Sequence, residues 1–173
     1  MARLYNQTVS VADHRKTAAA GVRCFVLTIS DTRTEATDTS GRAIVDLLDA
    51  AGHVVTERAL RRDEPREVRD LVAARLGTVD AIVTTGGTGI TSRDSTYEAI
   101  DGLLEKRLDG FGELFRALSY QEIGSAAMLT RAAAGVARAT AVFMLPGSEH
   151  AVRLGMARLI VPELGHIVRE LRR

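Results

Sequence analysis

A short apolar strand that runs directly into a glycine-rich turn constrains this chain more than any other feature. Residues 79–84 read VDAIVT, a run typical of a buried strand, and the sequence TGGTG follows at 85–89. Glycine tolerates positive φ and lets a ligand approach bare backbone. Ser95 and Glu98 have the spacing of a capping box, so we expect a helix to begin there. A strand, a glycine turn and a helix start together present backbone N–H groups to an anion, most often a phosphate.

The turn belongs to neither of the two common phosphate-binding patterns. It lacks the lysine of a Walker A loop and does not match G-x-G-x-x-G. Asp94 stands beside Ser95, which already supplies a helix cap, so Asp94 is a candidate metal ligand next to a phosphate. The purely structural alternatives are that the glycines only form a turn and that Asp94 only interacts with the helix dipole.

Strand-like and helix-like segments alternate along the rest of the chain. We expect further strands at 22–29, 53–60, 132–136 and 139–145, with a tight turn near 137–138. We expect helices to begin near Asp38, Pro65 and Ser148. We also expect residues 110–112 to interrupt regular secondary structure, and Pro162 to interrupt the last helix. This order predicts an α/β fold, a three-layer α/β/α sandwich whose sheet is mostly parallel with one antiparallel strand. Residues 21–173 would form this domain, and residues 1–20 an N-terminal arm.

Composition excludes several classes of function. The net charge of +1 over 173 residues gives no electrostatic footprint for nucleic acid or a membrane surface. The lone cysteine, Cys24, cannot form an intramolecular disulfide, which fits a reducing compartment. No apolar run approaches the ~20 residues of a membrane helix. We therefore expect a cytoplasmic protein with neither nucleic acid nor membrane among its partners.

Polar residues follow the predicted parallel strands, and such residues should meet at one edge of the sheet. The candidate substrate-binding residues there are Ser30, Asp31, Thr85, Gly86, Gly87, Thr88, Gly89, Pro146, Gly147 and Ser148. Asp63 and Asp94 would face the same edge, although Asp63 could instead cap the helix at Pro65 and Asp31 could be a turn residue. Carboxylates beside phosphates need a divalent cation between them, and Mg²⁺ typically uses one or two carboxylates plus substrate phosphates. This predicts magnesium-assisted phosphoryl or nucleotidyl transfer without a covalent nucleophile.

Several separate motifs extend this pattern along the chain. They are TTGGTG at 84–89 followed by Asp94, DTSG at 38–41, AGH at 51–53, GFGELFR at 110–116, QEIG at 121–124, TRAAAGV at 130–136 and LPGS at 145–148. In this order they resemble the MoaB/Mog family of molybdenum cofactor biosynthesis proteins, and the MoaB branch in particular. The resemblance covers residues 22 to 171.

The resemblance implies a molybdopterin-binding protein that transfers AMP from Mg-ATP to the terminal phosphate of molybdopterin. It assigns Asp63 and Asp94 as the catalytic, metal-holding residues, and the glycine turn with Pro146–Ser148 as the pocket for the pterin phosphate. Mg²⁺ would be the cofactor, and ATP and molybdopterin the substrates. It also implies a homotrimer or homohexamer, with other enzymes of the cofactor pathway as candidate partners. The alternative is a non-catalytic carrier or regulatory protein that binds molybdopterin.

Overall fold

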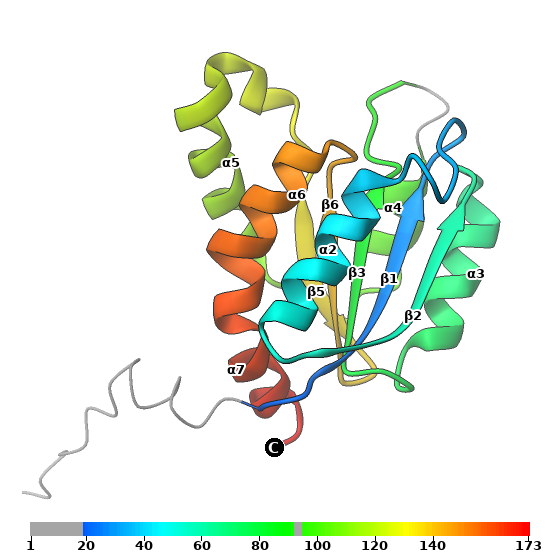
Figure 1. The fold of residues 1–173 in the computed structure, drawn as a ribbon, viewed down its shortest axis with the longest axis vertical. Coiled ribbons are helices and arrows are strands. Elements are labelled where there is room, and N and C mark those ends of the chain that lie inside the picture. Colours follow the sequence, from blue (N-terminus) through cyan, green and yellow to red (C-terminus); the bar gives the residue numbers. More distant parts are fainter. Residues whose placement is uncertain (1–18, 92–94) are drawn as a thin grey trace, which may run out of the picture.

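A six-stranded sheet lies at the centre of the part of the chain that the structure describes. The computed structural model describes residues 19–91 and 95–173 (Figure 1). The strands are β1 (Arg23–Ile29), β2 (Val54–Arg61), β3 (Ala81–Gly86), β4 (Lys106–Arg107), β5 (Ala133–Ala137) and β6 (Thr140–Leu145). Their order across the sheet is β2-β1-β3-β6-β5-β4. The neighbours β2, β1, β3 and β6 are parallel, whereas β5 runs antiparallel to both β6 and β4.

Helices cover both faces of this sheet. They are α2 (Thr39–Ala50), α3 (Pro65–Arg75), α4 (Thr96–Asp101), α5 (Asp109–Ile123), α6 (Glu149–Gly155) and α7 (Val161–Leu171). One core joins α2, α5, α6 and α7 to one face, and a second core joins α3 and α4 to the other (Figure 1). Alternate residues of β1 serve the two cores: Cys24 and Val26 the first, Phe25 and Leu27 the second. The three-layer α/β/α sandwich with a mostly parallel sheet is confirmed.

The predicted helix and strand ends hold where local chemistry sets them. Asp38 is the N-cap of α2, and Pro65 opens α3. Gly52 and Gly77 follow the ends of α2 and α3 with φ of 76° and 78°, values that favour glycine over residues with a Cβ.

In the second half of the chain the structure differs from the sequence predictions at three places. Residues 110–112 lie inside α5 and do not interrupt regular secondary structure. A Cβ on Gly112 would lie 2.9 Å from the Ala132 carbonyl oxygen, so this glycine allows the helix to pack closely on the chain beside it. The hairpin turn is one residue later than expected, at Arg138 and Ala139, both with positive φ. The strand β4 was not predicted, because two residues carry no periodicity.

The last helix is continuous where an interruption was expected. A π-helical segment (Met156–Ile160) joins α6 to α7, and Pro162 lies in the first turn of α7. Proline lacks the N–H that an α-helix would use, and a wider helical turn precedes it. At the other end of the described chain, the Ala19 N–H donates to the Gly165 carbonyl of α7 at 3.0 Å. The predicted arm, residues 1–20, lies outside the described residues except for its last two.

Candidate active site

The residues that follow the parallel strands meet at one edge of the sheet (Figure 1). The Asp63 N–H, after β2, donates to Asp31 Oδ1, after β1, at 3.2 Å. Thr85 at the end of β3 donates from Oγ1 to the Pro146 carbonyl, after β6, at 2.9 Å. A Cβ on Gly147 would lie 3.4 Å from the Gly86 Cα, so the tips of β3 and β6 nearly touch. The structure therefore brings together the described candidates from all four strand ends.

The glycine turn after β3 packs directly against β1. Gly86 and Gly87 have φ of 91° and 64°, in the region that favours glycine. A Cβ on Gly86 would lie 2.1 Å from the Ile29 carbonyl oxygen, and one on Gly87 would lie 3.1 Å from methyl carbons of Ile29 and Thr96. The turn therefore needs glycine for packing, whatever else it binds. Thr88 beyond it is half-buried, and Gly89 is exposed.

Asp63 does not cap a helix. The N-cap of α3 is Glu64, and no side chain bonds to the free N–H groups there. Instead, Asp63 Oδ1 accepts a hydrogen bond of 2.5 Å from Thr96 Oγ1, in the first turn of α4. The structural alternative for Asp63, as a cap for the helix at Pro65, is therefore wrong.

The hydrogen bonds of the predicted capping box at the start of α4 are absent among the residues that the structure describes there. Ser95 occupies the N-cap position, but its side chain makes no cap hydrogen bond. Glu98 pairs with Arg131 instead. Asp94, the other candidate catalytic and metal-holding residue, lies outside the described residues.

The loop after β1 is held by its own side chains. Ser30 Oγ accepts from the Thr32 and Arg33 N–H groups at 3.3 and 3.2 Å, which is a local turn. The Asp31 carboxylate, besides accepting from Asp63, lies 3.5 Å from Arg62 Nε. Ser30 thus has a local structural role, whereas Asp31 joins the loop after β1 to the residues that follow β2.

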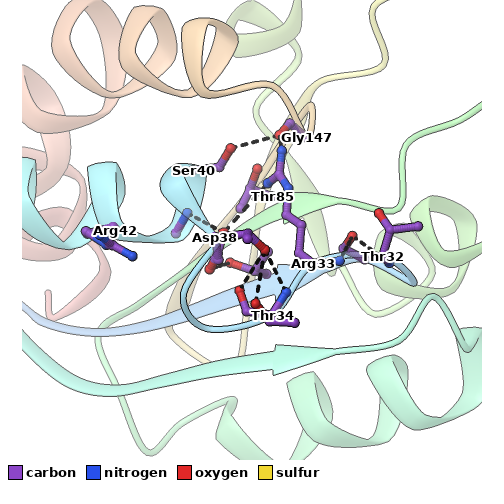
Figure 2. Close-up of polar contacts among 12 residues, drawn as sticks. Thr32, Arg33, Thr34, Asp38, Ser40, Arg42, Thr85 and Gly147 are labelled. Carbon is purple, nitrogen blue, oxygen red and sulfur yellow. Dashed lines mark hydrogen bonds and ion pairs between the residues drawn. The ribbon is translucent and has the colours of Figure 1, made fainter.

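Two donors converge on the carbonyl of Gly147, at the tip of β6 (Figure 2). Arg33 Nη2 donates to this oxygen at 2.7 Å and Ser40 Oγ donates at 2.8 Å. The next residue, Ser148, accepts from the Ala151 N–H at 3.2 Å and so caps α6, as the sequence predicts. Pro146–Gly147–Ser148 is therefore tied to the loop after β1 and to the first turn of α2.

The fully buried carboxylate of Asp38 lies next to Arg33, one of the two donors to the Gly147 carbonyl. It accepts from Thr28 Oγ1 at 2.7 Å, the Gly41 N–H at 2.9 Å and Arg58 Nη2 at 2.7 Å. Asp38 lies 3.6 Å from Arg33, which Figure 2 shows beside it. Burial alone would raise the pKa of Asp38, but the hydrogen bonds from Arg58, Gly41 and Thr28 outweigh it and lower the pKa. Asp38 is thus held ionised at the N-terminus of α2, where a negative charge is favourable.

The donor set at this edge suits a hard cation shared with phosphates. Among the residues that the structure describes, no three or more His, Cys, Asp or Glu side chains form a group that could hold a metal ion alone. The Asp63 N–H bonds to the Asp31 carboxylate, so both acidic residues lie at this edge, and carboxylate oxygens are the ligand type that Mg²⁺ takes together with substrate phosphates. Cys24 is no candidate nucleophile, because burial raises the pKa of its thiol to about 12.

Comparison with known proteins decides the family. A family model described as "Probable molybdopterin binding domain" matches residues 25–166. The chain is 54% identical over 166 residues to molybdenum cofactor biosynthesis protein B of Halalkalibacterium halodurans, which covers 94% of this chain and 98% of that protein. The chain belongs to the MoaB family of molybdenum cofactor biosynthesis proteins.

Other relatives agree with this MoaB assignment. The Bacillus subtilis protein of the same name is 49% identical, over 95% of this chain and 99% of its own length. A crystal structure of a molybdenum cofactor biosynthesis protein B superposes with a TM-score of 0.85 at 52% identity, covering 90% of this chain and 99% of that one. The structure of the tungsten cofactor synthesizing protein MoaB from Pyrococcus furiosus has a TM-score of 0.79 at 41% identity, with 90% and 100% covered. The resemblance read from the sequence motifs is confirmed.

Sequence reasoning missed four side chains that hold the edge of the site. Arg33 and Ser40 hold the Gly147 carbonyl, Thr96 bonds Asp63, and Arg131 donates to the Gly89 carbonyl. Ser40 and Arg131 lie within the family motifs, but their partners are 107 and 42 residues away. No periodicity or spacing reveals such pairs.

No helix in the described part of the chain is long and apolar enough to cross a membrane.

Proposed function

We propose that this protein binds molybdopterin at the carboxyl edge of its sheet and transfers AMP from Mg-ATP to the terminal phosphate of molybdopterin. The observation that carries this is the position of Asp63. It is not a helix cap; its carboxylate accepts a hydrogen bond from Thr96, and its backbone N–H donates to the Asp31 carboxylate. A carboxylate at this place, free of a capping duty, is the group that a metal–phosphate site requires.

Phosphate binding has support from the two glycine tips that face one another. Gly147, after β6, lies against Gly86, at the end of β3: a Cβ on Gly147 would be 3.4 Å from the Gly86 Cα. The first turns of α2 and α6 begin at the same edge, and helix N-termini favour anions. Arg33 adds a cation beside Gly147. We propose that these groups fix the phosphates of the two substrates.

Asp63 and Asp94 would hold Mg²⁺ together with the phosphates of the substrates. When bound, the cation neutralises charge on the phosphates, which otherwise repel both the carboxylates and each other. The Thr96 hydroxyl occupies Oδ1 of Asp63 and so fixes the orientation of that carboxylate. A fixed carboxylate costs less entropy when it binds its cation.

The chemistry then asks mainly for positioning. An oxygen of the terminal molybdopterin phosphate attacks the α-phosphorus of ATP and forms a new P–O bond. The bond from that phosphorus to the bridging oxygen breaks, and pyrophosphate leaves with the electron pair. No covalent intermediate on the protein is needed, so the residues described here contribute by holding the two phosphates in line.

The test combines purified protein, molybdopterin and Mg-ATP, with detection of adenylylated molybdopterin and pyrophosphate. We expect product with wild-type protein, loss of product with Asp94→Asn, and molybdopterin binding by Asp94→Asn that is unchanged or tighter, because one negative charge beside the phosphate is removed. Product formation by Asp94→Asn at the wild-type rate would contradict the assignment. If wild-type protein binds molybdopterin and yields no product, the alternative of a non-catalytic carrier or regulatory protein is the better one.

A further inference from the structure

We infer that Arg131 is a positioning residue, which holds the glycine turn in its phosphate-binding shape through the Gly89 carbonyl. The consequence for the substrate rests on the proposed function, whereas the effect on the turn is a property of the free protein. Arg131 precedes β5 and lies 42 residues from Gly89 along the chain.

One guanidinium group makes three contacts at the end of the glycine turn. Arg131 Nη1 donates to the Gly89 carbonyl oxygen at 2.6 Å, and Nη2 pairs with Glu98 Oε1. The guanidinium carbon also lies 4.3 Å from the centre of the Tyr97 ring. The side chain is only 23% exposed. A planar fork of donors can make these contacts at once, which a lysine ammonium cannot reproduce.

The antiparallel course of β5 brings Arg131 to this edge. In the parallel strands β1, β2, β3 and β6 it is the end of each strand that lies at the carboxyl edge. Because β5 runs against β6, with Ala133 opposite Met144, the beginning of β5 lies there instead. A residue just before β5 can therefore reach the turn that follows β3.

The contact with Gly89 fixes a peptide plane. In a planar trans peptide the carbonyl and the following N–H point in opposite directions, so holding the Gly89 oxygen also fixes the direction of the next N–H. A phosphate-binding turn works by presenting N–H groups and keeping carbonyl oxygens away from the anion. Glu98 neutralises the Arg131 charge, so Arg131 acts on the turn by orientation and not by attracting an anion.

Arg131 also holds the first turn of α4, the helix that follows the glycine turn. Arg131 holds Tyr97 and Glu98 in the first turn of α4, while Asp63 holds the neighbouring Thr96. Arg131 thus joins the glycine turn and the helix that follows it into one unit, and Asp63 joins the same helix to β2. Loss of Arg131 should loosen the turn without removing any group that contacts the substrates.

The experiment compares Arg131→Ala with Arg131→Lys, Glu98→Gln and the control Arg107→Ala. Arg107 pairs with Asp101, the last residue of α4, and is not one of the candidate site residues. The first measurement is amide hydrogen exchange of peptides from residues 84–91 in the protein without ligand. We expect exchange about tenfold faster in Arg131→Ala than in wild type or in Arg107→Ala.

The second measurement is KM and kcat for molybdopterin with Mg-ATP, together with the Kd of molybdopterin alone. Arg131→Ala should raise KM and Kd about tenfold or more with little change in kcat, because the turn binds substrate and transition state alike. Arg131→Lys keeps one donor for the Gly89 carbonyl and should recover part of this loss. Glu98→Gln keeps the Gly89 bond and should raise KM far less than Arg131→Ala.

Wild-type exchange and Kd in Arg131→Ala would overturn the inference. So would an equal rise of KM in Glu98→Gln, because the ion pair and not the Gly89 contact would then be responsible. If Arg131→Ala fails to fold, Arg131→Lys decides by the same two readouts. If wild-type protein makes no adenylylated product, the proposed function fails while exchange and Kd still test Arg131; if wild type is active and Arg131→Ala matches it, only the role of Arg131 fails.

Discussion

Thr96 Oγ1 donates a hydrogen bond of 2.5 Å to Asp63 Oδ1 and so joins the first turn of α4 to the end of β2. The next two residues of that turn, Tyr97 and Glu98, contact Arg131. The start of α4 is therefore held by side chains from two distant segments and not by a cap of its own. Mutations at Asp63 or Arg131 should therefore act on the same helix.

We expect Asp63→Asn to lower turnover about tenfold or more while leaving the melting temperature nearly unchanged. An amide oxygen still accepts from Thr96, and no helix cap is lost, because the side chain of Asp63 caps nothing. The lost negative charge removes a metal or nucleotide contact, and about 1.4 kcal/mol of transition-state stabilisation is a factor of ten. The measurement is product formation against Mg-ATP concentration, with thermal unfolding alongside. Asp70→Asn, an exposed position on α3, is the control. Full activity of Asp63→Asn would favour the non-catalytic alternative.

Gly86 and Gly147 form a matched pair for separating packing from binding. Gly86→Ala should destabilise the protein by more than about 2 kcal/mol, since its Cβ would lie 2.1 Å from a β1 carbonyl oxygen at φ of 91°. Gly147→Ala meets only an ordinary contact of 3.4 Å and should cost under about 1 kcal/mol. Its methyl group would nevertheless stand between the two glycine tips, so molybdopterin binding should weaken. Denaturant unfolding and ligand titration of both variants give the answer; unweakened binding by Gly147→Ala would place the phosphate elsewhere.

Asp80 should make stability depend on acid pH. Burial would raise the pKa of Asp80, but hydrogen bonds from Arg23 and Arg172 outweigh it and lower the pKa to about 2. Because the folded pKa lies below the unfolded value of about 3.9, the stabilisation is present above pH ~4 and is lost as pH falls toward 2. It amounts to roughly 2–3 kcal/mol, since one pKa unit corresponds to about 1.4 kcal/mol. The free energy of unfolding of wild type minus that of Asp80→Asn should therefore shrink between pH 4 and pH 2. A constant difference over that range would exclude the effect.

We propose self-association through the exposed apolar face of α5 and the 3₁₀-helix Gly124–Leu129. Leu114, Tyr120, Ile123, Met128 and Leu129 are all exposed there, with Met128 81% exposed. A trimer or hexamer of the 18.6 kDa chain would bury such a face. Light scattering at micromolar concentration should return a multiple of this mass, and Met128→Glu combined with Leu129→Glu should lower it. A monomer mass for wild type would contradict the proposal.

Local patterns predicted much of the fold because local chemistry sets it. The apolar run before the glycine turn, the cap at Asp38 and the proline at 65 each act within a few residues, and the structure has them where expected. The meeting of strand ends at one edge followed from the parallel course of the strands, and the contact of Thr85 with Pro146 bears this out.

Long-range partners decided what the sequence could not. Glu98 has the spacing of a capping-box residue, but Arg131 takes it as an ion-pair partner. Gly112 looks like a chain breaker, whereas the Ala132 carbonyl nearby requires a glycine within α5. Asp63 could be told from a helix cap only once Thr96 was placed beside it.

The π-helical segment at Met156–Ile160 corrects the phase of the last helix. Its buried apolar residues recur every fourth position: Val152, Met156, Ile160, Leu164 and Val168. In an α-helix of 3.6 residues per turn, each four-residue step overshoots a full turn by roughly 40°, so such a stripe would wind off the sheet. The wider π turn rotates less per residue and brings the stripe back. If the same five residues formed regular α-helical turns instead, everything beyond them would be rotated about the helix axis. Leu164 and Val168 would leave the core, and Gly165 would carry its carbonyl away from Ala19, where the described chain begins.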